Sequence, residues 1–353
     1  MSLSELRKNI NHIDEKIVKL LNERAGLSLK VGKEKASNRY PIYAPEREKE
    51  ILQTLRRWNK GPMTQKDFEA IYREIMSSSL SLEKRLKIAY FGSEGSNTHM
   101  AAMKKFGSRI DYVGYPTLAD IFAGVENGNC DYGIVPVENS IEGAVTPTYD
   151  LLVDSELKIC SQILLRISHH LLSNVALAKI KHIYSHPQVF GQCRNWLLAN
   201  LPQAGLIPMA STTDAAAKAA KTKNAAAIGS QLAAKIYGLK ILKHNIQDAA
   251  HNTTRFFVIG QQDVPPTGKD RTSVVFSIKD RPGALHAMIT PFRIHKINLT
   301  KIESRPSKKK AWEYYFFIDL EGHKDDVHVK KALSRLGDMC NSIKILGSYP
   351  VLS

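Results

Sequence analysis

Residues 251–260 read His-Asn-Thr-Thr-Arg-Phe-Phe-Val-Ile-Gly, and the interpretation of the whole chain starts from this stretch. Two hydroxyls and a guanidinium, from Thr253, Thr254 and Arg255, directly precede four residues that favour a β-strand. A polar cluster at the start of an apolar strand is typical of a functional site, although an ordinary loop entering an edge strand has the same pattern. The segments around this stretch decide between the two interpretations.

Residues 86–262 alternate short apolar runs with helical patterns, which predicts an α/β domain. Strands are expected at residues 87–91, 132–138, 159–167, 182–184 and 241–242, and helices at 100–106 and 190–201. The alanine-rich run 214–234 is interpreted as a well-packed helix whose start is capped by Ser211, Thr212 and Thr213, and residues 225–229 are also named as a segment of their own. Loops rich in Ser, Thr, Asn and Gln follow successive strands, which predicts a polar cleft between two doubly wound lobes.

The glycine-rich loop at residues 92–99 (GSEGSNTH) leads from an expected strand into an expected helix. Backbone N–H groups at such a position can bind an anion. A simple tight turn has the same sequence features, so both interpretations stay open.

Five sequence blocks in this domain resemble those of the prephenate dehydratase family, and they follow one another in the same order. They are VPVENSIEGAV (135–145), YSHPQVFGQC (184–193), the Ser-Thr of STTDAA (211–216), AAIGS (226–230) and NTTRF (252–256). The resemblance covers about residues 87–262 and implies an enzyme that expels water and carbon dioxide from prephenate to leave phenylpyruvate. It implies that Thr254 is the catalytic hydroxyl near the leaving group and that Arg255 holds a substrate carboxylate. It also implies that donors line the pocket at Asn139, Ser140, Ser185, Gln192, Ser211 and Thr212.

The identity of the proton donor in this dehydration is left open. An unperturbed threonine is a feeble acid, so Thr254 is expected to hydrogen-bond the leaving oxygen rather than to ionise. Glu138 is either structural or catalytic, and for His186 a positioning role is favoured over that of an acid. The chain departs from the family at Asn97, where an aromatic residue is common, and at Ala210, where some members have Glu.

Residues 261–268 form a polar, proline-containing linker to a third segment. Strands expected at 272–278, 299–303, 312–320 and 342–346 and helices at 283–294 and 327–336 give a βαββαβ order, which is the ferredoxin-like arrangement. Residues 280–285 (DRPGAL) and 303–306 (ESRP) resemble the two ligand motifs of ACT domains in phenylalanine-regulated dehydratases. The alternative is that both motifs are ordinary turns of a dimerising domain.

The ACT resemblance implies feedback inhibition by phenylalanine, which would bind where two ACT domains meet. Glu303 would contact the ammonium group of the amino acid and Arg305 its carboxylate, while Gly283 lets the backbone approach closely. The implied contact residues are Gly283, Ala284, Leu285, Glu303, Ser304 and Arg305. The domain is expected to span residues 270–353.

The first 85 residues carry an apolar stripe at helical spacing, which predicts a helix buried against other helices. Its apolar members are Leu6, Ile10, Ile13, Ile17, Leu20, Leu27 and Val31. Arg24 fills a vacancy in the stripe and Lys35 takes its next step, which favours an internal anion site over snorkelling side chains. Further helices are expected from Pro45 and after the N-cap residue Thr64. Three helices of about 32, 15 and 22 residues bury little alone, so an intertwined dimer is expected.

Residues 6–24, 31–35, 41–52 and 71–84 together resemble the all-helical class of chorismate mutase. In that family the pocket holds a dicarboxylate in the compact conformer needed for a pericyclic rearrangement, which requires restraint and charge stabilisation but no nucleophile. The resemblance implies carboxylate-binding cations at Arg24, Arg47 and Arg7, the last given by the partner subunit. It also implies Lys35 at the ether oxygen, Glu48 at a substrate hydroxyl and Ser79 at a carboxylate.

Glu83 occupies the position opposite the ether oxygen, where some relatives have Gln. A carboxylate cannot donate a hydrogen bond, so Glu83 must be protonated to assist. Mutase activity is therefore expected to fall as pH rises. Ala44 stands where several relatives have Asp, which removes one minor polar contact.

The composition sets the remaining expectations for this chain of 353 residues. The amphipathic N-terminus and the lack of a long apolar run predict a cytoplasmic protein without a signal peptide. Four cysteines without a CxxC pair favour reduced thiols and no metal site. The formal charge of +16 is compatible with nucleic acid, but the only dense basic run is residues 308–310, so small polyanionic substrates are favoured.

Together the resemblances predict a bifunctional enzyme of phenylalanine biosynthesis with three domains: residues 1–85 (mutase), 86–262 (dehydratase) and 270–353 (ACT). Its expected partners are chorismate, prephenate and phenylalanine, with no cofactor, nucleic acid or membrane. A homodimer or a dimer of dimers is expected. One alternative is a prephenate or arogenate dehydratase with a non-catalytic helical domain. A second is a non-catalytic amino-acid sensor, since paired α/β lobes also form ligand-binding proteins.

Overall fold

The computed structural model describes residues 1–38, 40–249, 251–278, 281–307 and 313–351. The chain divides into two compact units, of which one comprises Met1–Lys87 and Phe106–Asp111 and the other Ile88–Lys105 and Tyr112–Ser353. Residue 280 of the first ACT motif, the basic run 308–310 and the expected strand start at 312 lie outside the described residues. Among the helices that are described, none is long and apolar enough to cross a membrane.

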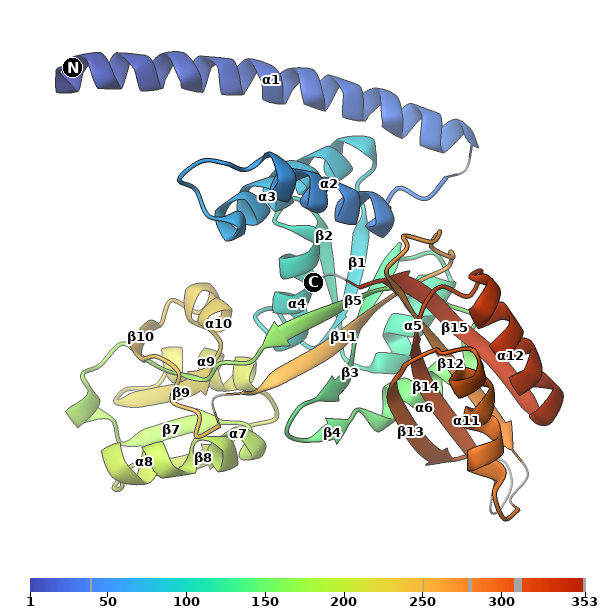
Figure 1. Ribbon diagram of the computed structural model, residues 1–353. Helices are drawn as coiled ribbons and strands as arrows, with labels where there is room; N and C mark the ends of the chain where they lie inside the picture. Colours follow the sequence, from blue (N-terminus) through green and yellow to red (C-terminus); the bar gives the residue numbers. More distant parts are fainter. Residues whose placement is uncertain (39, 250, 279–280, 308–312, 352–353) are drawn as a thin grey trace. The chain divides into compact units, whose positions relative to one another are not determined.

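The first unit contains the three predicted helices, α1 (Leu3–Asn38), α2 (Pro45–Trp58) and α3 (Gln65–Glu83) (Figure 1). Pro45 is the first residue of α2, and Thr64 caps α3 in a reciprocal capping box with Asp67. The end of α1 packs closely on α3, because a Cβ atom at Gly32 would lie 2.9 Å from the Cα atom of Glu83.

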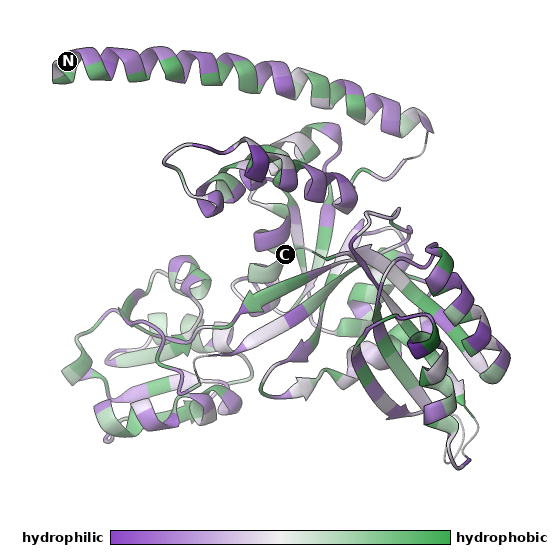
Figure 2. Cartoon of the chain, viewed as in Figure 1, coloured by the Kyte–Doolittle hydropathy of each residue, from purple (hydrophilic) through white to green (hydrophobic). Residues whose placement is uncertain are grey.

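Among the residues that the structure describes, most of α1 is exposed and only its second half packs on another helix. The seven apolar residues of its predicted stripe are between 43% and 63% exposed, and Figure 2 shows hydrophobic positions recurring along the helix. An isolated amphipathic helix of this length gains little stability without a surface to pack against. The exposed stripe therefore fits the expectation that a second subunit covers it.

The second unit begins with a lobe built on a mixed six-stranded sheet. Its strands are β1 (Lys87–Phe91), β2 (Asp111–Tyr115), β3 (Tyr132–Asn139), β4 (Gly143–Ala144), β5 (Lys158–Arg166) and β11 (Thr253–Gly260). The order is β2-β1-β3-β11-β5 with β4 added to β3, and its helices are α4 (Asn97–Phe106), α5 (Leu118–Glu126) and α6 (Thr146–Asp154). The chain leaves this lobe after β5 and returns through β11, and these two strands pair antiparallel along their length (Figure 1).

The second lobe has a five-stranded sheet in the order β10-β6-β9-β7-β8. Its strands are β6 (His170–Ser173), β7 (His182–Ser185), β8 (Gly205–Pro208), β9 (Ala225–Gly229) and β10 (Lys240–Lys243). Its helices are η1 (Leu177–Lys179), α7 (Pro187–Gln192), α8 (Arg194–Asn200), α9 (Thr212–Ala220) and α10 (Gln231–Ile236). Strands β7, β8 and β9 are parallel, whereas β6 and β10 are antiparallel to their neighbours.

Two predictions of local structure in this lobe are wrong. The alanine-rich run 214–234 is not one helix but α9, β9 and α10, since the chain reverses at Asn224, which has a positive φ of 55°. All five residues of β9 are buried between β6 and β7, where small side chains allow helices to pack closely on the sheet. The segment 190–201 is also interrupted, because Cys193 leaves the helical conformation between α7 and α8.

The last domain has the predicted βαββαβ order. It comprises β12 (Asp270–Ile278), α11 (Ala284–Ile294), β13 (Leu299–Pro306), β14 (Tyr314–Glu321), α12 (Val327–Met339) and β15 (Ser342–Pro350). The antiparallel sheet has the order β13-β14-β12-β15, and α11 and α12 cover one of its faces (Figure 1).

The opposite face of this sheet is part of the core of the first lobe. Phe317, Leu346 and Tyr349 are buried together with Ile159 of β5 and Phe257 of β11. A Cβ atom at Gly347 would lie 2.3 Å from the carbonyl oxygen of Ile159, so only glycine allows β15 to approach β5 this closely.

Candidate active sites and regulatory site

Four of the seven predicted mutase residues face one another between α1 and α3. The Nζ atom of Lys35 lies 2.8 Å from Oε2 of Glu83, and it also donates to the carbonyl oxygen of Ile42 at 2.7 Å. Arg24 lies 11 residues before Lys35 on α1, and its guanidinium donates to the hydroxyl of Ser79, which lies four residues before Glu83 on α3. The Glu83 side chain is only 8% exposed, so this charged pair lies inside the helical unit. Two pairs, Lys35–Glu83 and Arg24–Ser79, thus connect α1 to α3.

The other three predicted mutase residues lie outside this group. Glu48 on α2 accepts a hydrogen bond from the Tyr43 hydroxyl at 3.3 Å. The guanidinium of Arg47 pairs with Glu50 at 2.8 Å, with a side chain that is 67% exposed. Arg7 is exposed on the part of α1 that carries the uncovered stripe. A role in binding the substrate stays a prediction for all three.

In the first lobe of the larger unit, Thr254 of β11 and Asn139 of β3 are direct neighbours, because they are paired across these two antiparallel strands. The Nδ2 group of Asn139 donates to Oγ1 of Thr254 at 2.9 Å and to Oδ1 of Asn252 at 2.7 Å. Its Oδ1 atom accepts from the backbone amides of Ile141 and Glu142, which fixes the orientation of the amide. The strands therefore set the direction from which Asn139 approaches the threonine hydroxyl.

A chain of hydrogen bonds extends from Asn139 to the second lobe. Asn252 donates to Oε1 of Gln192 on α7 at 3.4 Å, and Nε2 of Gln192 donates to Glu142 at 3.1 Å. The same Oε1 atom lies 2.8 Å from Nε2 of His169. Burial lowers the pKa of His169, which favours a neutral ring that donates from Nε2. Gln192 therefore connects the two lobes next to Thr254.

Sequence reasoning missed three members of this network, Asn252, Glu142 and His169. Asn252 and Glu142 fall inside the recognised blocks NTTRF and VPVENSIEGAV, so their polar side chains were a usable signal. His169 is in no recognised block, and its partner Gln192 is 23 residues away in the sequence.

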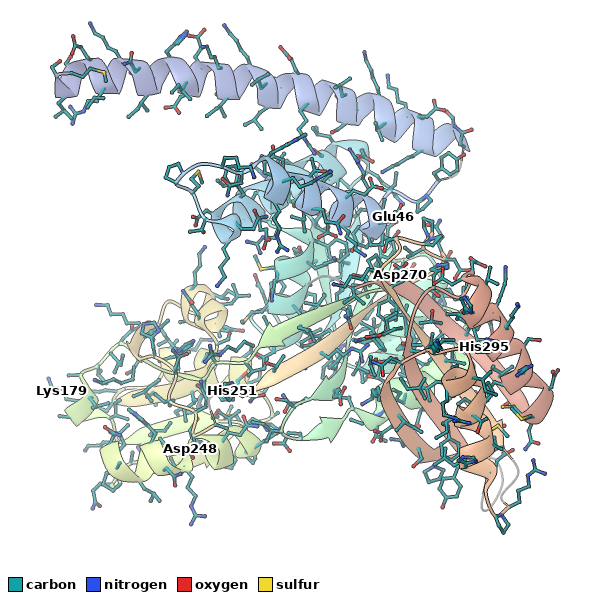
Figure 3. All side chains as sticks on the ribbon, viewed as in Figure 1. Glu46, Lys179, Asp248, His251, Asp270 and His295 are labelled. Carbon is teal, nitrogen blue, oxygen red and sulfur yellow. The ribbon has the colours of Figure 1, made fainter. Side chains whose placement is uncertain are left out.

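The predicted serines and threonine make contacts that hold the backbone. Ser140 accepts from the amide of Thr253 and donates to the carbonyl oxygen of His251, which joins the end of β3 to the start of β11. Figure 3 labels His251 near the start of β11. Ser185 is fully buried and donates to the carbonyl oxygen of Ile228. Ser211 is the N-cap of α9, and Thr212 is the first residue of that helix. These contacts account for the four residues structurally, and pocket-lining roles for them stay predictions.

The glycine-rich loop meets the second lobe. The hydroxyls of Ser93 and Thr213 lie 2.6 Å apart, and Ser230 donates to the carbonyl oxygen of Gly95 at 2.9 Å. His99 is buried, stacks on Tyr90 and accepts from the amide of Gly95. These contacts support the tight-turn interpretation of the loop.

The predicted role of Arg255 needs correction. Consecutive residues of a strand point to opposite faces of its sheet, so Arg255 is turned away from Thr254. Its guanidinium donates to Gln162, Asp319 and Tyr349 at 3.0, 2.5 and 2.8 Å, and the residue is 8% exposed. Three of its N–H groups are thus engaged by the protein on the face opposite Thr254, which argues against the predicted contact with a substrate carboxylate.

Two open assignments gain structural support. Glu138 forms an ion pair of 2.8 Å with Lys301 on β13, which favours a structural role. His186 is the N-cap of α7, where its Nδ1 atom accepts from the amide of Gln188 at 3.3 Å. This contact favours positioning over acid catalysis.

The predicted phenylalanine motifs occupy two elements of the last domain. Gly283 has a φ of 79° and caps α11, followed by buried Ala284 and exposed Leu285. On β13, Glu303 and Arg305 share the face that meets the first lobe, whereas Ser304 between them points to the other face. Arg305 lies 3.2 Å from Asp150 of α6, and Glu303 lies 3.9 Å from Lys301. Both predicted ligands thus have charged neighbours within the chain.

Comparisons with known proteins agree with this arrangement. Three family profiles match in order: Chorismate mutase type II over residues 6–84, Prephenate dehydratase over 88–264 and ACT domain over 272–338. The bifunctional chorismate mutase/prephenate dehydratase of Aquifex aeolicus (strain VF5) is 48% identical over 353 residues, which cover 99% of this chain and 98% of the relative.

Two solved structures extend the likeness to three dimensions. The prephenate dehydratase of Arthrobacter aurescens in complex with L-Phe has a TM-score of 0.70 and 33% identity, covering 75% of this chain and 90% of its own. A protein described as a novel type of quorum quenching acylase has a TM-score of 0.70 and 28% identity, covering 75% of this chain and 98% of its own.

A helical mutase domain, a two-lobed dehydratase domain and an ACT domain on one chain define a bifunctional enzyme of phenylalanine biosynthesis. The chain belongs to the family of bifunctional chorismate mutase/prephenate dehydratases. It rearranges chorismate to prephenate and converts prephenate to phenylpyruvate. The full-length similarity favours this function over a dehydratase with a non-catalytic helical domain and over a sensor without activity.

Proposed function

We propose that Thr254 acts in dehydration by donating a hydrogen bond to the departing hydroxyl of prephenate. The observation that carries this role is the hydrogen bond from Nδ2 of Asn139 to Oγ1 of Thr254. Because the amide group is the donor, the threonine keeps its own proton for a second partner. Expulsion of the leaving group creates an aromatic ring, so a well-placed donor to the oxygen supplies most of what the step requires.

Gln192 and Asn252 hold the lobes in the geometry that this step needs, since they bridge α7 to the Asn139–Thr254 pair. Their amides, together with the N-terminal region of α9 at Ser211 and Thr212, offer neutral donors to the substrate carboxylates. Prephenate is the expected substrate. Arogenate differs by an amino group in place of one keto oxygen and is the substrate to compare with it.

In the mutase site, Lys35 donates to the ether oxygen, and Arg24 and Ser79 bind a carboxylate. Arg47 and Glu48 complete the pocket from α2, and Arg7 enters it from a second subunit. The exposed stripe of α1 supports a dimer in which each helix packs on the partner, because seven large apolar side chains are left uncovered in one chain. We expect this homodimer, or a dimer of such dimers, in the cytoplasm.

Replacing Glu83 with glutamine is expected to keep or raise the mutase rate. In the free site the Glu83 carboxylate is paired with Lys35 at 2.8 Å, and a carboxylate cannot donate a hydrogen bond to the ether oxygen, whereas the amide of glutamine can. Initial rates of chorismate consumption measure this, with the dehydratase rate of each sample as control. A Glu83→Gln rate at least about 100-fold below the parent, with dehydration unchanged, would rule out a hydrogen-bond donor at this position as a participant.

The ACT domain is proposed to make the dehydratase responsive to phenylalanine, which binds at the motifs of Gly283 and Ser304 when two such domains pair. The direct test of the whole assignment supplies purified protein with chorismate alone and follows phenylpyruvate. We expect phenylpyruvate to form, and excess phenylalanine to suppress its formation while prephenate accumulates. Conversion of prephenate but not of chorismate would leave the helical domain without a catalytic role. A rate unchanged by phenylalanine would reject the regulatory assignment alone.

A further inference from the structure

The two strands that carry Asn139 and Thr254 are each tied to the ACT sheet by the residue next to the catalytic pair. Glu138 precedes Asn139 and forms an ion pair with Lys301 at 2.8 Å. Arg255 follows Thr254 and forms an ion pair with Asp319 at 2.5 Å. We call these four charged residues the coupling quartet: Glu138, Arg255, Lys301 and Asp319.

The coupling quartet is ordered by both sheets. Glu138 and Arg255 are directly paired across β3 and β11, and Lys301 and Asp319 are directly paired across β13 and β14. Each pair places opposite charges side by side, and each ion pair between the sheets joins opposite charges again. Four charges of alternating sign therefore connect one cross-strand pair of the dehydratase sheet, Glu138 and Arg255, to one cross-strand pair of the ACT sheet, Lys301 and Asp319.

Of the two ion pairs in the quartet, the pair of Arg255 with Asp319 is held by more hydrogen bonds. Asp319 also accepts from Ser273 of β12 at 2.5 Å, and the hydroxyls of Ser273 and Tyr349 lie 2.8 Å apart. Three ACT strands thus converge on one guanidinium. Burial raises the pKa of Tyr349 and keeps its phenol neutral, so Asp319 is the anion that matches Arg255. Separating a buried ion pair of this kind leaves an uncompensated charge, which costs free energy. The relative position of Arg255 and Asp319 is therefore tightly constrained.

The Lys301 corner leads toward the predicted regulatory site. Lys301 is 12% exposed at its side chain and lies 3.9 Å from Glu303, the proposed contact for the effector ammonium group. On the dehydratase side, the pairing of β3 with β11 slips by one residue immediately after Arg255. Such a bulge turns side chains locally and is common beside active sites. A small shift of β13 would therefore move Lys301 and, through the ion pair, Glu138, which is the residue before Asn139.

We propose that the coupling quartet positions the Asn139–Thr254 pair and transmits the state of the ACT sheet to it. Arg255 and Glu138 are positioning residues, and they act on the substrate only through their neighbours in the strands. The transmission part rests on the proposed regulation by phenylalanine, whereas the positioning part does not. The same arrangement explains how a regulator can act on the dehydratase reaction through contacts within one chain.

Asp319→Asn and Lys301→Met test the two corners in the full-length enzyme. Asp319→Asn keeps the shape of the side chain but removes its charge, and we expect a dehydratase kcat about 10- to 100-fold lower with KM nearly unchanged. Lys301→Met is expected to keep the parent affinity for phenylalanine in calorimetry. The factor by which saturating phenylalanine lowers kcat/KM should nevertheless shrink at least about fivefold, the lower end of typical coupling. If Lys301 had only a structural role, its replacement would not weaken inhibition by phenylalanine while leaving phenylalanine binding unchanged.

Lys344→Met is the matched control, because Lys344 of β15 also joins the ACT sheet to the first lobe, at the carbonyl oxygens of Val153 and Ser155 at the end of α6. Its response to phenylalanine should equal that of the parent. An equal loss in Lys344→Met would overturn the proposal, since any contact between the domains would then suffice. So would a parent-like response in Lys301→Met. If phenylalanine does not inhibit the parent enzyme, the proposed regulation is wrong, but the kcat of Asp319→Asn still tests the positioning role. If Asp319→Asn does not fold, the kcat of Arg255→Lys tests that role instead.

Discussion

Replacing Thr254 with alanine is expected to lower the rate of prephenate dehydration by at least about 100-fold, the range seen when one pre-organised hydrogen-bond donor is removed from an active site. The substitution removes the hydroxyl that Asn139 orients and leaves the amide of Asn139 with Asn252 as its partner. Phenylpyruvate formation from prephenate measures the effect. Chorismate consumption by the same sample should stay near the parent rate, because the mutase residues lie in the other compact unit.

Thr254→Ser is the control for this prediction, since it keeps a hydroxyl at the same position and should retain most of the activity. Loss of both reactions in Thr254→Ala would indicate misfolding rather than a catalytic role. Dehydration at the parent rate in Thr254→Ala would exclude the threonine hydroxyl as the donor to the leaving group.

Replacing Lys35 with alanine is expected to lower the mutase rate by about 100- to 1,000-fold, because the donor to the ether oxygen is lost. The buried carboxylate of Glu83 also loses its cation, which disturbs the free site. Supplied with chorismate alone, the variant should form almost no phenylpyruvate. Supplied with prephenate, it should form phenylpyruvate at the parent rate.

The matched control is Lys33→Ala, which removes an exposed cation two residues away on the same helix. It should leave both reactions unchanged. If Lys35→Ala rearranges chorismate within about threefold of the parent, electrostatic stabilisation of the ether oxygen by Lys35 is excluded.

Sequence reasoning succeeded where one local pattern has one structural solution. The stripe of α1, the cap at Thr64 and the alternation of apolar runs in the ACT domain each predicted their elements correctly. It failed at the alanine-rich run, because alanine fits a helix surface and a fully buried strand such as β9 equally well. It also overlooked β2, α5 and α6, which are short elements of five or nine residues.

For the candidate site, the sequence indicated which residues take part but not the directions in which their side chains point. Thr254 and Asn139 do meet, as the recognised blocks implied. Arg255 was assigned to the same site by the resemblance to the family, whereas the alternation of side chains along a strand places it on the opposite face. The bond between Asn139 and Asn252 spans 113 residues of sequence, and no local pattern specifies such a contact.

The close approach at Gly347, where β15 lies against Ile159 without room for a side chain, has a consequence for how this enzyme can change. A regulatory domain that shares a hydrophobic core with its catalytic neighbour cannot be exchanged as an independent cassette. A domain grafted from another enzyme must bring a sheet face that fits β5 and β11, including a glycine at this point. Regulation and catalysis in this part of the chain are therefore constrained to evolve together.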